Sequence, residues 1–193
     1  MAGILLSDGS GARMSGFRLE TERLVLRDWR ADDLDPLHAI CSDPRVMATI
    51  GPLQDRETAR VGLDRLMART ARDGHTFWAL ERKVDARMIG FCGVARGRVA
   101  PIEGELEIGW RLAWDCWGQS YAREAAEASL AWAARDHPGE RVCAITSVGN
   151  TRSRGLMERL GMRHDPAIDF DHPDIPEDSP LRRHVVYWLE AAR

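Results

Sequence analysis

Short stretches in which apolar and polar residues alternate, or in which apolar residues run together, predict β-strands. Alternation suits a strand because successive side chains point to opposite faces of a sheet. The clearest example is the stretch 105–113, in which most even-numbered residues are large and apolar. The predicted strands are 19–29, 75–83, 87–97, 105–113, 141–148 and 182–190.

Apolar residues spaced three or four apart predict helices between these strands. The predicted helices are 32–40, 55–73, 120–136 and 150–160. Gly74 is expected to end the second of them, and Gly161 the last. Since no internal repeat or linker interrupts this order, the sequence predicts one α/β (α+β) domain over residues 17–193.

The stretch 105–147 has the order strand, turn, helix, strand, which places its two strands parallel through a right-handed crossover. Ligands of open α/β sheets bind at the carboxyl ends of strands, beside helix starts. The turn Gly118-Gln119-Ser120 lies there, without the spacing of a dinucleotide fingerprint or a P-loop. Its backbone N–H groups and the helix dipole favour an anion, and Ser120 is expected to cap the helix. The alternative is a plain tight turn.

The composition argues against some classes of partner but does not identify the function. With 44% hydrophobic residues, 30% charged residues and a net charge of −3, the chain is typical of a globular protein. Neither a nucleic-acid nor a membrane partner is expected, because the charge is not basic and no apolar run approaches the roughly 20 residues that span a bilayer. Residues 1–16 predict a flexible leader, with Met14 as an alternative start.

The four cysteines lie far apart and form no Cys-x-x-Cys pair. This spacing predicts free thiols in a reducing cytoplasm rather than disulfides or structural zinc. We therefore expect a cytoplasmic protein.

Four segments carry a resemblance to a known family: LETERLVLRDW, ELEIGWRL, WGQSYAREAAEASLAWA and NTRSRGLMERLGM. In this order they make residues 19–189 resemble the GNAT superfamily of N-acetyltransferases, and within it the Rim-type branch, which acetylates the amino termini of ribosomal proteins. The resemblance implies a mixed, splayed central sheet of about six to seven strands flanked by about four helices. It also implies acetyl transfer from acetyl-coenzyme A to a primary amine by direct attack in a ternary complex, without a metal.

In this family the turn binds the pyrophosphate of acetyl-coenzyme A with backbone amides. Asp115 replaces the usual first residue of the turn pattern, and we expect its carboxylate to point to solvent. The pantetheine arm would lie between the strands at 105–112 and 142–147, with a backbone N–H near 110–112 polarising the thioester. The resemblance thus assigns these residues to acetyl-coenzyme A: Trp110, Arg111, Leu112, Trp117, Gly118, Gln119, Ser120, Tyr121, Ala122, Asn150 and Ser153.

Glu107 is the candidate that accepts the proton of the amine, directly or through water. Alternatively, it is only a charged residue of the strand face or a partner of Arg111. By resemblance, Asn150 would hydrogen-bond the pantetheine and Ser153 would lie near the sulfur; alternatively, Asn150 only caps a helix and Ser153 only fills its first turn. Met157 stands where many members carry a proton-donating Tyr, so Ser153 or water must serve.

The acceptor is either a protein amino terminus or a small-molecule amine. Trp29 and Trp78 are candidates to line its site. The loop 165–180 is rich in Asp and Pro but lacks the Gly and terminal Glu of a calcium loop, so we expect a solvated loop beside the acceptor cleft whose acids could attract a cationic amine. We expect a monomer or a homodimer. The alternative to an enzyme is an acyl-coenzyme A sensor or partner-binding protein that has lost turnover.

Overall fold

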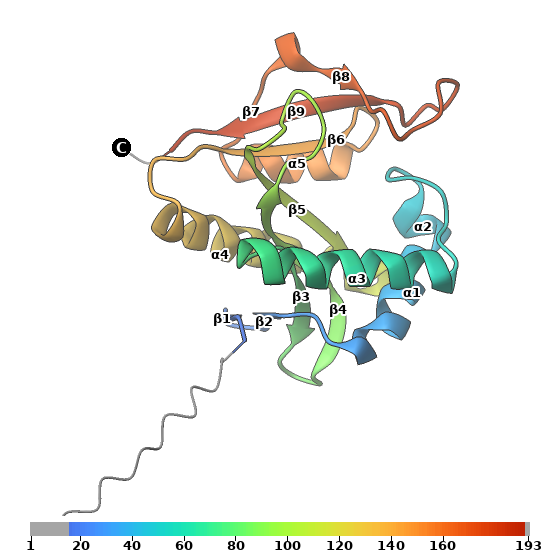
Figure 1. The fold of residues 1–193 in the computed structure, drawn as a ribbon, viewed down its shortest axis with the longest axis vertical. Coiled ribbons are helices and arrows are strands. Elements are labelled where there is room, and N and C mark those ends of the chain that lie inside the picture. Colours follow the sequence, from blue (N-terminus) through green and yellow to red (C-terminus); the bar gives the residue numbers. More distant parts are fainter. Residues whose placement is uncertain (1–15, 192–193) are drawn as a thin grey trace, which may run out of the picture.

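One mixed sheet runs through residues 16–191, the part of the chain that our computed structural model describes (Figure 1). Within these residues the strand order is β1-β2-β3-β4-β5-β6-β9-β7, and β8 also pairs with β9. The strands are β1 (Arg18–Glu20), β2 (Leu24–Arg27), β3 (Phe77–Arg82), β4 (Arg87–Arg96), β5 (Leu106–Leu112), β6 (Val142–Ser147), β7 (Arg163–His164), β8 (Phe170–Asp171) and β9 (Arg183–Leu189). The helices are α1 (Leu34–Cys41), α2 (Pro44–Met47), α3 (Arg56–Asp73), α4 (Tyr121–Asp136) and α5 (Thr151–Arg159).

The predicted fold class is confirmed, but the predicted numbers of strands and helices were too low. The described residues form nine strands and five α-helices. The extra elements are short: β1, β7 and β8 have two or three residues each, and α2 has four. Segments of this length are too short to display a hydrophobic period. The predicted leader lies almost wholly outside the described residues.

The stretch predicted as one strand, 19–29, instead forms the hairpin of β1 and β2. The Thr21 N–H donates to the Leu24 carbonyl (3.0 Å), and the Leu24 N–H donates to Thr21 Oγ1 (3.0 Å). A threonine hydroxyl that bonds nearby backbone in this way competes with a continuous strand.

β5 and β6 run parallel but pair over only two residues, which are Leu106 and Glu107 on β5. Beyond these residues the two strands separate, although β5 stays paired with β4 and β6 stays paired with β9 to their ends. Among the described residues, the facing edges of β5 and β6 therefore lack strand partners over their carboxyl-terminal parts. The predicted splay of the sheet is confirmed.

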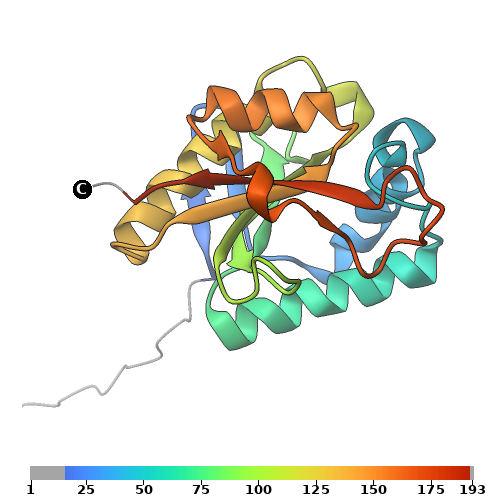
Figure 2. The same ribbon diagram turned by 90° about the horizontal axis from the view of Figure 1, so that it is seen from above.

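Helices cover both faces of the sheet, and Figure 2 shows α3 on one side and α5 on the other. On one face α4 packs against β3 and β4, where the Trp132 ring meets the Trp78 ring edge-on at 4.9 Å. On the other face α1 packs against α3, and Arg111 Nη1 of β5 lies 3.1 Å from Cys41 Sγ of α1. No helix in the described range is long and apolar enough to cross a membrane.

Ser120 precedes α4 but does not cap it. Its φ is +63°, in the left-handed region, and its side chain makes no capping hydrogen bond. The prediction was wrong because a capping serine needs an extended backbone, which this turn does not allow. Asn150, by contrast, does cap α5: its Oδ1 accepts a hydrogen bond from the Ser153 N–H at 3.2 Å.

Candidate functional site

A cavity of about 840 Å³ lies between the start of α4 and α5, beside the carboxyl-terminal part of β5. We call it the α4–α5 cavity. Almost all residues that the sequence assigned to acetyl-coenzyme A line it: Trp110, Arg111, Leu112, Trp117, Gly118, Ser120, Tyr121, Ala122, Asn150 and Ser153. Gln119 is the exception, since it is not among the lining residues. Residues that are 40 positions apart in sequence thus meet at one cavity.

The turn before α4 has a left-handed backbone at two of its three residues. Gly118 has a φ of +74° and Ser120 a φ of +63°, and only glycine adopts this region without strain. The first helical hydrogen bond runs from the Glu124 N–H to the Ser120 carbonyl at 3.0 Å. The N–H groups of residues 121–123 therefore have no helical acceptor, and together with the helix dipole they favour an anion at this end of α4.

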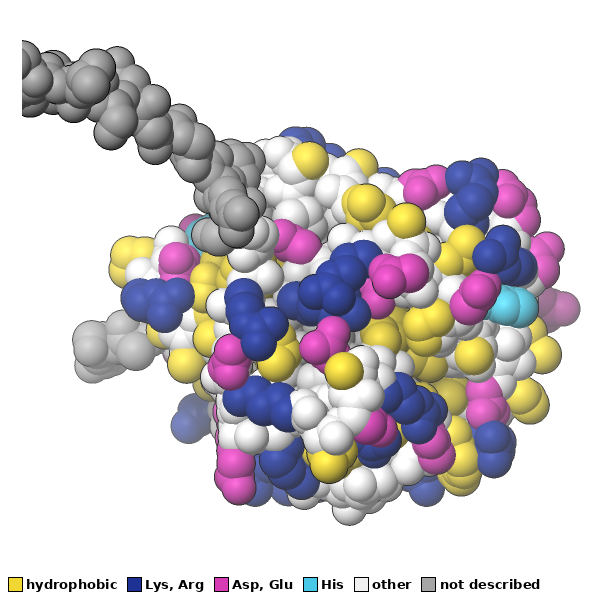
Figure 3. All heavy atoms as spheres, turned by 90° about the horizontal axis from the view of Figure 1, so that it is seen from below, with side chains coloured by type: hydrophobic (Ala, Val, Ile, Leu, Met, Phe, Trp, Pro, Cys, Tyr) yellow, Lys and Arg dark blue, Asp and Glu magenta, His cyan; other side chains and the backbone are white. Residues whose placement is uncertain are grey.

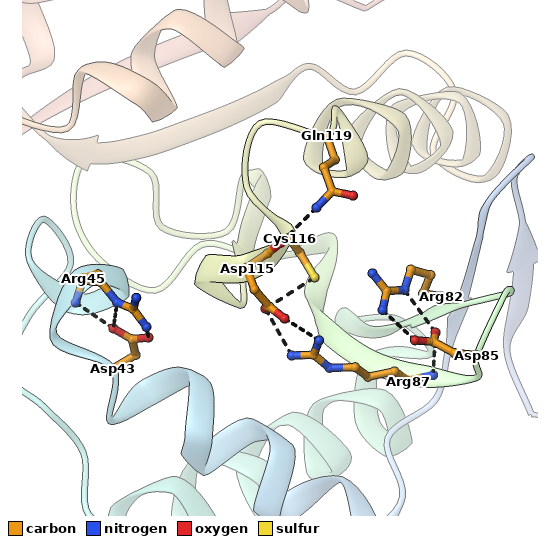
Figure 4. Close-up of polar contacts among 8 residues, drawn as sticks. All are labelled: Asp43, Arg45, Arg82, Asp85, Arg87, Asp115, Cys116 and Gln119. Carbon is orange, nitrogen blue, oxygen red and sulfur yellow. Dashed lines mark hydrogen bonds and ion pairs between the residues drawn. The ribbon is translucent and has the colours of Figure 1, made fainter.

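Side chains around the turn hold its shape. Trp117 Nε1–H donates to the Leu112 carbonyl at 2.9 Å, and Gln119 Nε2–H donates to the Asp115 carbonyl at 2.9 Å (Figure 4). Arg23 Nη1 donates to the Gln119 carbonyl at 3.0 Å. The Gln119 side chain is therefore used to fix the turn, which explains why it does not line the cavity.

Asp115 forms an ion pair with Arg87 of β4, with Oδ2 to Nη1 at 2.5 Å and Oδ1 to Nη2 at 3.1 Å (Figure 4). Its side chain is 58% exposed, as expected. The Arg87 guanidinium lowers the pKa of the Asp115 carboxyl, so this carboxyl is ionised at neutral pH. The positive charge of Arg87 offsets the negative charge of Asp115. The Asp115 carboxylate therefore repels a phosphate in the cavity less than its position in the sequence suggests.

Three arginines that the sequence analysis missed also line the α4–α5 cavity: Arg123, Arg152 and Arg159. The Arg152 guanidinium lies 4.8 Å from the centroid of the Trp117 ring. In a sequence, charged residues near a helix start look like ordinary solvent-exposed residues. Their residue type alone therefore does not identify them as cavity-lining residues. The seven-residue spacing of Arg152 and Arg159, which is two helical turns, was the available signal that both share one face of α5.

The start of α5 brings Asn150 and Ser153 to the same place. Asn150 is buried, and its Nδ2–H donates to Thr146 Oγ1 at 2.9 Å while its Oδ1 caps the helix. Ser153 is half-buried. Met157 follows one turn later, is 2% exposed and carries no proton that it could donate.

A second cavity, of about 510 Å³, lies on the α3 side of β5, and we call it the α3 cavity. Glu107 lines it, together with Met157 and the rings of Phe77 and Phe91. Burial raises the pKa of Glu107 to about 7, an effect that the positive charge of Arg69 opposes. A carboxyl with this pKa can exchange a proton near neutral pH, as a general base must.

Glu107 is not the partner of Arg111. Among residues 16–191 neither side chain forms an ion pair; Arg111 instead contacts Cys41 and lies 5.3 Å from the centroid of the Phe91 ring. The pairing alternative for Glu107 was therefore wrong.

The two cavities join at the gap between β5 and β6. They share these lining residues: Thr49, Ile50, Trp110, Arg111, Asn150 and Ser153. A molecule bound in the α4–α5 cavity can therefore meet a molecule bound in the α3 cavity, with Ser153 at the junction and Glu107 on the α3 side.

Trp29 and Trp78 do not line either cavity, contrary to expectation. They are 5% and 0% exposed and belong to the core. For Trp78, alternation along β3 explains the error, because Trp78 faces α4 while its neighbour Phe77 faces the α3 cavity.

The loop 165–180 does lie beside the α3 cavity, which His172 and Ile175 line. Two of its acids are already paired, however. Asp169 lies 2.9 Å from a His164 ring nitrogen, and Asp171 lies 3.3 Å from an arginine of β9. No group of three or more His, Cys, Asp or Glu in the described part of the chain is placed to hold a metal ion.

Comparisons with known proteins identify the family and the fold. A family model described as an acetyltransferase (GNAT) domain matches residues 23–163. The protein YkkB of Bacillus subtilis strain 168 is 28% identical over 152 residues, which are 78% of this chain and 88% of YkkB.

Two solved structures share the fold. An acetyltransferase from Agrobacterium tumefaciens C58 has a TM-score of 0.73 and 25% identity, covering 98% of this chain and 99% of its own. RimL, a ribosomal L7/L12 alpha-N-protein acetyltransferase solved in complex with coenzyme A, has a TM-score of 0.73, covering 91% of this chain and 98% of RimL. Its identity is 14%, so this likeness concerns the fold alone.

Proposed function

Because the chain belongs to the GNAT acetyltransferase family, we propose that it transfers an acetyl group from acetyl-coenzyme A to a primary amine. The observation that carries this proposal is the junction of two cavities at the splayed strands β5 and β6. The α4–α5 cavity has the turn whose free backbone N–H groups favour an anion, and the α3 cavity has the Glu107 carboxyl, whose pKa is about 7. Both substrates can then be bound at once, as direct transfer in a ternary complex requires.

The residues of the α4–α5 cavity fit acetyl-coenzyme A as substrate. The N–H groups at the start of α4 and the guanidinium groups of Arg123, Arg152 and Arg159 suit its phosphates. The free edges of β5 and β6 suit the amide-bearing pantetheine arm, which hydrogen-bonds as an added strand would. Acetyl-coenzyme A supplies the thioester, and the chain supplies its binding and orientation.

On the α3 side, Glu107 accepts the proton that the amine must lose. Its raised pKa lies close to a working pH near neutrality, where proton acceptance by a carboxylate is most effective. A backbone N–H near 110–112 polarises the thioester carbonyl, and Ser153 or water returns a proton to the leaving thiolate. Met157 cannot take that last role.

The likeness to RimL supports a Rim-type enzyme through the fold alone. A protein amino terminus and a small-molecule amine are both primary amines, and the reaction proposed here is the same for either. The same cavity would also serve an acyl-coenzyme A sensor, a second candidate that the buried Met157 favours.

Two measurements on the full chain separate these functions. Isothermal titration with acetyl-coenzyme A measures binding, and a thiol-reactive dye measures release of coenzyme A in the presence of a panel of amines. Binding with amine-dependent thiol release supports the transferase. Binding without release from any amine supports the sensor, and absence of binding at millimolar acetyl-coenzyme A would refute both.

A further inference from the structure

Most arginines of the described residues pair with a carboxylate within 4.0 Å. Figure 3 shows the result on one face, where basic and acidic side chains lie next to one another. Within residues 16–191 the exceptions are Arg65, Arg69, Arg98, Arg111, Arg152, Arg154, Arg159 and Arg163. A bound anion would not have to displace a carboxylate from any of these arginines.

The unpaired arginines concentrate at the two cavities. Arg111, Arg152 and Arg159 line the α4–α5 cavity, where the phosphates of acetyl-coenzyme A account for them. The α3 cavity has four: Arg65 and Arg69 from α3, Arg98 from the β4–β5 loop, and Arg111 from β5. Acetyl-coenzyme A does not account for the first three of these, because they line the α3 cavity and not the α4–α5 cavity.

The α3 cavity is positively charged, although the whole chain carries a net charge of −3. Glu107 is the one carboxylate among the lining residues of this cavity. Burial lowers the pKa of His172 and of His184, so these two histidines are neutral near pH 7.

The arginines of this cavity also repel one another. Burial lowers the pKa of Arg69, and the positive charge of Arg98 lowers it further. Arg111 is half-buried, and its Nε has no hydrogen-bond partner among the described residues. Grouping four guanidinium groups with Glu107 as the one carboxylate of the cavity costs free energy, and a bound anion reduces that cost.

We propose that the acceptor is a small primary amine that also carries a carboxylate or a phosphate. This inference rests on the proposed transferase function and names its second substrate. Guanidinium groups bind both kinds of anion with paired, charge-assisted hydrogen bonds. The cavity volume of about 510 Å³ is that of a small-molecule site, and Phe77, Phe91 and Ile175 give it apolar walls.

The same charges prepare the amine for reaction. An ammonium group entering the α3 cavity is repelled by the guanidinium groups, so its neutral form is favoured there. The neutral amine is the form that attacks a thioester. A diamine lacks the anion that offsets this repulsion and carries a second positive charge, so it is a poor acceptor.

The test compares primary amines that carry the anion with related amines that lack it. L-phenylalanine is compared with L-phenylalaninamide, O-phosphoethanolamine with ethanolamine, and putrescine serves as a diamine. The measured quantity is kcat/KM from release of coenzyme A. We expect the anionic member of at least one pair to exceed its neutral partner at least tenfold, and the two pairs distinguish a carboxylate from a phosphate.

Variants connect the preference to the cavity. Arg65→Gln and Arg69→Gln are each expected to raise the KM for the anionic acceptor at least tenfold and to leave the KM for acetyl-coenzyme A unchanged. Arg65→Gln should also leave kcat/KM for the neutral acceptor unchanged, whereas Arg69→Gln should shift its pH profile, because the charge of Arg69 acts on Glu107. Arg65 is exposed, so its variant stays informative if Arg69→Gln fails to fold. The matched control is Arg56→Gln on the same helix, where Arg56 pairs with exposed Asp35 at 2.9 Å; it should change neither KM.

Three outcomes would overturn the inference. If neutral amines or putrescine react as well as the anionic acceptors, the transferase function stands and the anionic acceptor is wrong. If turnover occurs only with peptides that begin with acidic residues, the assignment to a small molecule is wrong. If acetyl-coenzyme A does not bind and no amine releases thiol, the proposed function itself fails, and this inference with it.

Discussion

Replacing Glu107 by Gln should make the protein more stable at alkaline pH while making it less active. Burial holds the Glu107 carboxyl at a pKa of about 7, against an ordinary value of 4.5. Each pKa unit corresponds to about 1.4 kcal/mol, so ionising this carboxyl costs the folded state about 3 kcal/mol at most. Gln keeps the size and polarity of the protonated carboxyl but never ionises, so it removes this cost.

The sign of the pH dependence follows from proton binding. Between pH 4.5 and pH 7 the folded state binds more protons at this site than the unfolded state, because its pKa is the higher one. The free energy of unfolding of the wild type therefore falls as pH rises through this window. We expect Glu107→Gln to be more stable than the wild type by about 3 kcal/mol at pH 8 and by less than about 1 kcal/mol at pH 5.

Urea unfolding at the two pH values measures this difference, and a thermal scan at pH 8 should show a higher Tm for the variant. Thiol release at pH 8 tests the catalytic side, where loss of a general base lowers kcat about 10²- to 10⁴-fold. In the wild type kcat/KM should rise through an apparent pKa of about 7, and in the variant this rise should be absent.

Glu105→Gln, at the position just before β5, is the matched control. Glu105 pairs at 2.8 Å with Arg141, whose side chain is 47% exposed, and exposed pairs contribute less than about 1 kcal/mol. This variant should keep its turnover and the pH dependence of its stability. A Glu107→Gln protein that is less stable than the wild type at pH 8, or that is as active, would refute the reasoning.

Five further substitutions test the α4–α5 cavity. Gly118→Val should abolish acetyl-coenzyme A binding in a folded protein, because at φ +74° the new side chain enters the open space of the cavity that the phosphates need. Ser120→Gly should relieve backbone strain of about 1 kcal/mol and change the affinity for acetyl-coenzyme A less than tenfold. Isothermal titration measures the affinity of both variants, and circular dichroism checks that they are folded. Asn150→Ala should lower the free energy of unfolding by about 1–2 kcal/mol, because α5 loses its cap, and should weaken coenzyme binding. Ser153→Ala should lower turnover more than coenzyme binding. Kinetics per folded molecule check both variants. Asp115→Asn should change the acetyl-coenzyme A affinity less than threefold in the same titration, because its charge is already offset by Arg87.

Local sequence patterns were sufficient to predict most elements of the fold. Alternation along 105–113, small residues along α4 and the glycine after α3 each act within a few residues of the chain. These signals predicted the strand–turn–helix–strand unit, and the order of the elements then predicted the parallel pair of β5 and β6. Such predictions succeed because hydrophobic period and caps are local properties.

Features that depend on distant partners could not be predicted in this way. The offset of the Asp115 charge requires Arg87, which lies 28 positions earlier and reaches it only through the hairpin of β3 and β4. The left-handed backbone of Ser120 follows from how the turn is held by Trp117 and Gln119, and its residue type suggested a cap instead. The arginines of the α3 cavity come from a helix, a loop and a strand, and the sequence gives no sign that they converge.

The alternation of β5 explains how one strand can serve two substrates. By alternation Glu107 and Arg111 share one face of β5, and Trp110 and Leu112 share the other. Glu107 lines the α3 cavity, Leu112 lines the α4–α5 cavity, and Trp110 and Arg111 line both at their junction. A shift of one residue in register would exchange these two sets and remove both sites. β6 cannot prevent such a shift, because it pairs with β5 over only two residues. The register of β5 must therefore be set by β4, which pairs with β5 along its whole length. The gap on one edge of β5, where the two cavities join, thus depends on the continuous pairing along its other edge.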